Sequence, residues 1–148
     1  MKRLDGWALA LAAVLFGAGV AHFVAPDGFD AIVPHVLPGS ERFWTTLSGV
    51  VELALAVGMV WPRTRRRAAT LAAVFFVVVF PANIKDAVDA STRAATEFTL
   101  ALLRLPLQIP LIWWAWHVRT RAERVEPSRR AVLPGPSSQE TASGRPLE

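Results

Sequence analysis

The chain has 148 residues, of which 53% are hydrophobic, and its mean hydropathy is +0.35. It is too apolar for an ordinary soluble domain of this length, which indicates a small membrane protein. The formal net charge is +4 and cysteine is absent. Disulfides, thiol redox chemistry and thiolate metal sites are therefore excluded.

Four apolar segments follow one another along the chain, each near the length of about 20 residues that crosses a hydrocarbon core. They cover residues 7–25, 43–61, 68–87 and 98–118. The first follows Lys2 and Arg3 as a secretory signal would, but three further spans leave no soluble domain to export. We therefore predict an all-α, polytopic integral membrane protein in which residues 1–118 form a four-helix transmembrane bundle.

Residues 26–40 connect the first two spans and are rich in proline and glycine. Within them, apolar residues recur at an amphipathic spacing, at Phe29, Ile32, Val33, Val36 and Leu37. We predict an interfacial segment. It is either a lid over the bundle or a connecting loop whose apolar side chains dip into the headgroups.

Small residues predict where the helices pack closely. In the first span Ala13, Gly17 and Ala21 recur every four residues, which predicts a groove on that face. Gly49 and Gly58 are expected to allow a similar approach in the second span.

Basic residues gather on one side of the predicted bundle. They lie before the first span, in the turn at 62–67 and in the tail at 119–148, whose last twenty or so residues we predict to be disordered. The positive-inside rule then makes both termini cytoplasmic, and tryptophans such as Trp7 and Trp114 fall at the same predicted side. We expect a multi-pass protein of the bacterial cytoplasmic (inner) membrane, in contact with the lipid bilayer, with no nucleic-acid partner.

Charged residues inside apolar spans cost free energy in lipid and usually have a functional or structural role. Counted from the predicted tryptophan belt, Glu52 and Arg104 lie at depths of ~14 and ~15 Å. Ser48 and Gln108 lie one helical turn from them. We therefore predict an ion pair between Glu52 and Arg104 that is hydrogen-bonded by Gln108 and Asn83.

His22 and Asn83 form a second polar tier, nearer the outer surface. Pro81, Pro106 and Pro110 each remove a backbone donor, and the freed carbonyls need partners, which Asn83, Arg104 and Gln108 are placed to supply. The candidate ligand-binding residues are therefore His22, Ser48, Glu52, Asn83, Arg104 and Gln108.

Two other features near these residues predict no chemistry. Lys85 and Asp86 are expected to mark the outer end of the third span and to extend toward water. The histidines are dispersed, and no nucleophile triad or nucleotide fingerprint is present, so we predict neither a metal site nor a catalytic residue.

Four short motifs resemble those of the DoxX-like family of small bacterial membrane proteins, over a stretch from about Phe16 to Trp116. They are H-F-x-x-P from His22, S-G-x-x-E from Ser48, F-P-A-N from Phe80 and R-L-P-L-Q from Arg104. The resemblance implies a four-helix bundle in the cytoplasmic membrane. Some relatives are subunits of a thiosulfate:quinone oxidoreductase, and others anchor soluble redox enzymes. The absence of cysteine departs from any version with dithiol chemistry.

Three hypotheses about function follow. The first is a non-catalytic membrane subunit or scaffold that binds a quinone-like or lipid molecule near Glu52 and Arg104 and supports a redox enzyme. The second is a transporter or permeability factor for a small solute, in which case a homo-oligomer would enlarge the path. The third is a purely structural bundle whose ion pair fixes the helix register.

Overall fold

The computed structural model of the chain describes residues 5–91 and 95–125, and all the regular secondary structure in these ranges is helical. The helices are α1 (Gly6–Val24), α2 (Pro26–Asp30), α3 (Glu41–Val60), α4 (Arg65–Val78), α5 (Phe80–Ala90) and α6 (Ala95–Val125). The all-α prediction is confirmed. The predicted disordered part of the tail lies outside the described residues.

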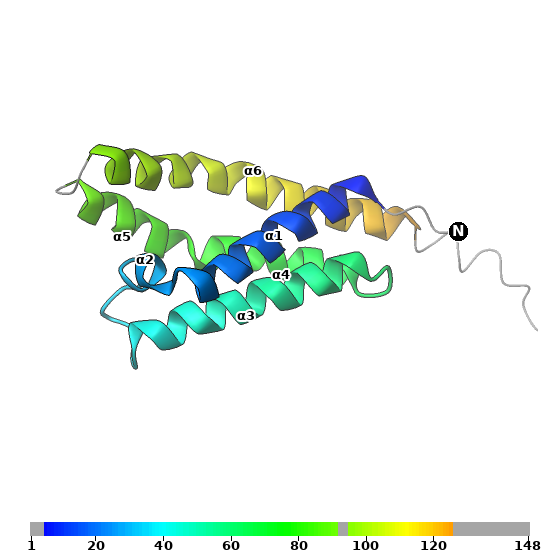
Figure 1. Cartoon of the computed structure of the whole chain (residues 1–148). Coiled ribbons are helices and arrows are strands. Elements are labelled where there is room, and N and C mark those ends of the chain that lie inside the picture. The colour runs from blue at the N-terminus through cyan, green and yellow to red at the C-terminus, as the bar shows by residue number, and fades with distance from the viewer. Residues whose placement is uncertain (1–4, 92–94, 126–148) are drawn as a thin grey trace, which may run out of the picture.

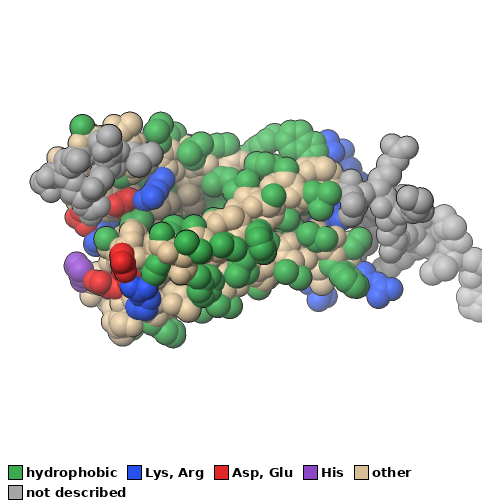
Figure 2. Space-filling model, viewed as in Figure 1, with side chains coloured by type: hydrophobic (Ala, Val, Ile, Leu, Met, Phe, Trp, Pro, Cys, Tyr) green, Lys and Arg blue, Asp and Glu red, His purple; other side chains and the backbone are tan. Residues whose placement is uncertain are grey.

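In the described part of the chain, three helical stretches are long and apolar enough to cross a membrane. They are α1, α3 and the continuous run of α4 and α5, Arg65–Ala90. Figure 2 shows hydrophobic side chains along the flank of the molecule and charged side chains gathered at its two ends. Both observations support a membrane protein.

The ends of the helices are held by local side chains. The carboxylate of Asp5 accepts from Trp7 N at 3.2 Å and caps α1, and Ser40 Oγ accepts from Phe43 N at 3.2 Å and caps α3. At the other end of α3, Arg65 Nε donates to the carbonyl of Met59 at 2.9 Å. The turn between α3 and α4 is therefore short and fixed.

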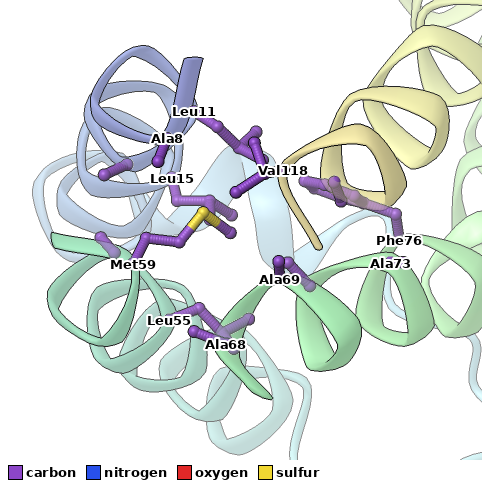
Figure 3. Packing of buried hydrophobic residues seen from close by; sticks show 14 residues of the cluster. Ala8, Leu11, Leu15, Leu55, Met59, Ala68, Ala69, Ala73, Phe76 and Val118 are labelled. Atoms are coloured by element: carbon purple, nitrogen blue, oxygen red, sulfur yellow. The ribbon is translucent and has the colours of Figure 1, made fainter. Parts of the chain in front are cut away.

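One end of the bundle is densely packed. The N-terminus of α1, the turn between α3 and α4, and the C-terminus of α6 all lie there (Figure 1). Because Arg65, Arg66 and Arg119 belong to these segments, we call it the basic end. Leu11, Leu15, Met59 and Val118 are at most 1% exposed and converge on the alanine-rich face of α4, as Figure 3 shows.

Aromatic contacts tie α1 to α6 at the basic end. Trp114 Nε1 donates to the carbonyl of Trp7 at 3.0 Å, and the two indoles meet edge to face. The prediction that these tryptophans share one side is confirmed. Helix α6 also continues seven residues beyond the predicted span end at 118, because Glu123 accepts from Arg119 at 3.0 Å and pairs with Arg66 of α4 at 3.1 Å.

The predicted third span is two helices. Helix α4 ends at Val78 and α5 begins at Phe80, with Pro81 in its first turn, where the missing N–H is tolerated. Beyond this break α5 runs beside α6 and away from α3 (Figure 1). The bundle is therefore tight at the basic end and spread at the other, which we call the open end.

Close approach of α1 and α3 depends on Gly19 and Gly49. A Cβ on Gly49 would lie 2.8 Å from the Cβ of His22 and 3.2 Å from the carbonyl oxygen of Gly19. The expectation for Gly49 is confirmed. So is that for Gly58, where an added Cβ would lie 3.0 Å from the Cβ of Ala68 in α4.

The predicted groove in α1 is wrong. Ala13 and Gly17 are exposed, and a Cβ on Gly17 would have no neighbour within 4 Å. A spacing of four residues marks a helix face, but only the neighbouring helices decide which face is buried. Here α1 buries the face that carries Ala8, Leu11, Leu15 and Gly19.

We expect Gly49→Ala to lower the free energy of unfolding by about 1–3 kcal/mol, because the new methyl group overpacks the contact with His22. The matched control, Gly17→Ala, adds the same methyl group to open space and should be neutral or stabilising by about 0.5–1 kcal/mol. Denaturant titration in detergent micelles measures both. Equal stability of the two variants would contradict the close contact.

Candidate functional site

A cavity of about 760 Å³ lies between the helices toward the open end. Its walls are mainly apolar, with α1 and α3 on one side and α4, α5 and α6 on the other. The polar side chains in the walls are His22, Thr45, Ser48, Glu52, Asn83, Arg104 and Gln108. The structure thus places all of the sequence-predicted ligand-binding residues around one cavity of the size of a small-molecule site.

On the wall formed by α1 and α3, His22 lies against Glu52. The distance from His22 Nε2 to Glu52 Oε2 is 3.4 Å, and the imidazole also packs against the ring of Phe29, with centroids 3.9 Å apart. Glu52 is 8% exposed. The glycine contact described above brings the two helices close enough for this pair to form.

The opposite wall, formed by α5 and α6, is internally hydrogen-bonded. Asn83 Nδ2 donates to Gln108 Oε1 at 3.2 Å, and Gln108 Nε2 donates to the carbonyl of Phe76 in the last turn of α4. The Phe76 carbonyl is one residue before that of Val77, which Pro81 leaves without its usual backbone donor, so the bonding of the freed carbonyls by polar side chains stays a prediction. The Gln108 amide joins α6 to both sides of the break before Pro81.

The predicted ion pair between Glu52 and Arg104 is wrong. Arg104 Nη1 instead donates to Asp86 Oδ2 of α5 at 2.7 Å, while Glu52 contacts His22. Counting residues predicts how deep a side chain lies but not the direction in which it points. Because α5 turns toward α6 at the break, Asp86 is carried to Arg104, and Glu52 remains across the cavity on α3.

Asp86 is the residue that sequence reasoning misjudged at this site. It is 3% exposed, and the expectation that it extends to water is wrong. The sequence does indicate that Asp86 points into the site, because it follows Asn83 by three residues and therefore shares its helix face. Lys85, on another face, reaches Asp89 Oδ2 at 2.7 Å and the carbonyl of Ala31 at 3.3 Å.

The segment at 26–40 covers the cavity. Arg42 holds it to α3 through Asp27 Oδ1 at 2.6 Å and Asp30 Oδ2 at 2.9 Å, and Trp44 Nε1 donates to the carbonyl of Pro38 at 2.8 Å. The predicted apolar positions Phe29, Ile32, Val33, Val36 and Leu37 all line the cavity. Of the two interpretations of this segment, these contacts favour the lid.

Three buried polar atoms in the wall of α1 and α3 have no hydrogen-bond partner among the described residues. They are His22 Nδ1, Thr45 Oγ1 and Glu52 Oε2. Each such atom costs about 1–3 kcal/mol when it stays unsatisfied, so a cluster of them needs an explanation. Thr45 was missed by sequence analysis, although it precedes Glu52 by seven residues and so lies on the same helix face.

The side chains around the cavity suit hydrogen bonding and proton exchange. His22 and Glu52 carry groups that can bind or release a proton, and Thr45 and Ser48 carry hydroxyls that donate and accept. Among the described residues, no group of three or more His, Asp or Glu side chains is placed to hold a metal ion.

The ion pair between Asp86 and Arg104 can be tested by a double-mutant cycle. Arg104→Met should destabilise the protein by about 2 kcal/mol, less than a fully buried pair because the Arg104 side chain is 45% exposed. Arg104→Met and Asp86→Leu together should cost less than the sum of the two single changes, because the second change removes the carboxylate that the first leaves without Arg104. Arg104→Met and Glu52→Leu should be additive. Coupling with Glu52→Leu in place of Asp86→Leu would mean that Glu52 is the partner of Arg104.

The part of the chain that matches a known protein family includes the whole site. A family described as "Domain of unknown function (DUF8561)" matches residues 11–119, a stretch that contains every residue lining the cavity. Neither the curated proteins nor the solved structures provide a match. Since the family match covers well over half of the chain, the protein belongs to the DUF8561 family.

Proposed function

We propose that this protein is a four-span membrane subunit that binds a quinone-like molecule in its cavity and supports a redox enzyme, without being a catalyst itself. The single observation that carries the proposal is the apolar cavity with unsatisfied polar atoms on one wall. Apolar walls bury a ring and its hydrocarbon tail, and a few polar groups fix its orientation. The DoxX-like motifs support the redox partner.

In this proposal α6 is the fourth span. Its 31 residues extend ~46 Å, which exceeds the thickness of a hydrocarbon core. The basic end then faces the cytoplasm, with both termini there, and the opposite end carries the acidic residues Asp27, Asp30, Glu41 and Asp89. In this proposal the protein lies in the inner membrane, and its ligand enters from the bilayer.

A purely structural bundle is the second candidate, and specific contacts favour it. Gln108 supports the helix break, and the ion pair between Asp86 and Arg104 joins α5 to α6. A purely structural role does not account for the cavity or for the unsatisfied atoms of His22, Thr45 and Glu52. For that reason we prefer ligand binding.

Mass spectrometry of organic extracts tests the proposal. Wild-type protein purified in mild detergent should retain a quinone or a related lipid. Ala18→Phe should lose it, because Ala18 lines the cavity and the larger side chain fills the space. The matched control is Ala13→Phe, which places the same ring on the exposed face of α1 and should retain the ligand.

Glu52→Gln provides a variant that preserves the volume of the side chain in case Ala18→Phe does not fold. We expect Glu52→Gln to retain less ligand while remaining monodisperse. If stable wild-type protein carries no quinone or lipid beyond the amount carried by Ala18→Phe, the cavity is not a ligand site and the structural bundle is the better account.

A further inference from the structure

A groove of about 580 Å³ lies between α3 and α4, and its walls are almost entirely apolar. Val51, Phe75 and Val78 line both this groove and the cavity, so the two features adjoin there. The polar side chains of the groove are Thr64 and Arg67, at the basic end, and none of the polar residues of the cavity lines it. The groove is therefore a second feature of different composition, to which the proposed function gives no role.

Small residues of two helices form the groove. Gly58 of α3 allows close contact with Ala68 of α4 beside the turn, and Ala54 leaves space one turn further along α3. Leu71 and Val74 of α4 also line the groove, and each is more than half exposed. Because both helices belong to stretches that can cross a membrane, exposed apolar side chains on them face hydrocarbon. The groove therefore opens to the lipid.

The length and position of the groove match one leaflet of a bilayer. From Arg67 to Val78, α4 rises ~16 Å, about half the thickness of a hydrocarbon core. The start of this stretch lies at the basic end, beside the turn between α3 and α4 (Figure 1). A hydrocarbon chain in the groove would then begin at the level of the headgroups and end near the centre of the bilayer.

The guanidinium of Arg67 differs from those of the two preceding arginines. Arg65 Nε donates to the carbonyl of Met59 at 2.9 Å, and Arg66 Nε lies 3.1 Å from Glu123 Oε1. Within the described part of the chain, the side chain of Arg67 has no hydrogen bond or ion pair. Its donors are therefore available to an acceptor outside the protein, at the end of the groove.

We propose that the groove between α3 and α4 binds an anionic phospholipid. An acyl chain lies in the groove, and the phosphate accepts from Arg67. A guanidinium can donate two parallel hydrogen bonds to phosphate oxygens. Arg63, Arg65 and Arg66 add positive charge to the same turn, which favours a headgroup with net negative charge over a zwitterionic one. This inference does not depend on a ligand in the cavity.

Native mass spectrometry of the full chain in detergent, titrated with one lipid at a time, measures the selectivity. The probes are dioleoyl phosphatidylglycerol and dioleoyl phosphatidylcholine, which carry the same chains and differ in headgroup charge. We expect phosphatidylglycerol to bind at least about fivefold more tightly, because one arginine near an anionic lipid contributes about that factor.

Arg67→Gln and Arg63→Gln form a matched pair of variants. Both residues are exposed and each change removes one positive charge from the turn, but only Arg67 lines the groove. Arg67→Gln should weaken phosphatidylglycerol binding at least about fivefold, because the phosphate loses its charged donor. Arg63→Gln should weaken it much less.

Ala54→Phe tests the position of the acyl chain. Its ring should fill the groove and weaken phosphatidylglycerol binding, whereas Ala13→Phe, on the exposed face of α1, should leave binding unchanged. Ala18→Phe, which fills the cavity but not the groove, should also bind phosphatidylglycerol like the wild type. Loss of the cavity ligand with retained phosphatidylglycerol would therefore concern the proposed function alone.

Several results would overturn the inference. Equal binding of the two lipids would mean that the headgroup charge is not recognised. Equal losses in Arg67→Gln and Arg63→Gln would mean that the turn attracts anionic lipid only through its total charge. Full binding by Ala54→Phe would mean that the chain lies elsewhere. A stable wild-type dimer that binds no lipid would mean that a second copy covers the groove, and a monomer that binds none would mean that no lipid is held there.

Discussion

The hydrogen bond from Gln108 to the carbonyl of Phe76 supports the helix break on which the rest of the architecture depends. A helix that runs through proline loses one backbone donor, and in a bilayer no water replaces it. The chain solves the problem by ending α4 at Val78, starting α5 at Phe80, and bringing an amide from α6 to a carbonyl of the last turn of α4. A side chain on one helix thus makes a break in another tolerable.

The break has consequences for the whole open end. Because α5 departs from the line of α4, it follows α6 and makes no extensive contact with α1 or α3. Asp86 and Arg104 hold α5 and α6 together, and the glycine contact holds α1 and α3 together. Two pairs of helix segments result, with the cavity between them and the segment at 26–40 across it. At the basic end the alanine face of α4 closes the same bundle into an apolar core.

Much of the fold could be predicted from the sequence, because apolar length and charge distribution respond to the same physical constraint, the thickness of a hydrocarbon core. The helical stretches, the shared end of Trp7 and Trp114, and the gathering of polar residues around one cavity all follow from position along a span. The direction in which a side chain points around its helix does not follow from its position along a span. For that reason the residue spacing predicts the wrong face for Ala13 and Gly17 and the wrong carboxylate partner for Arg104.

The helix break is the other feature that position could not reveal. Pro106 and Pro110 lie within a continuous α6, whereas Pro81 begins a new helix, and the local sequence alone does not distinguish these outcomes. They differ in the neighbours: a facing Gln108 stabilises the break before Pro81. Once α5 has turned, Asp86 lies beside Arg104, so the error in pairing came from treating the third span as one straight helix.

A high-resolution structure of the protein in a lipid nanodisc, determined by electron cryo-microscopy with a rigid binding fragment, would test the central claim most directly. The account predicts that α5 and α6 stay apart from α1 and α3 at the open end, with non-protein density between Thr45 and the lid segment. A bundle in which α5 packs against α3 and the cavity has closed would contradict it.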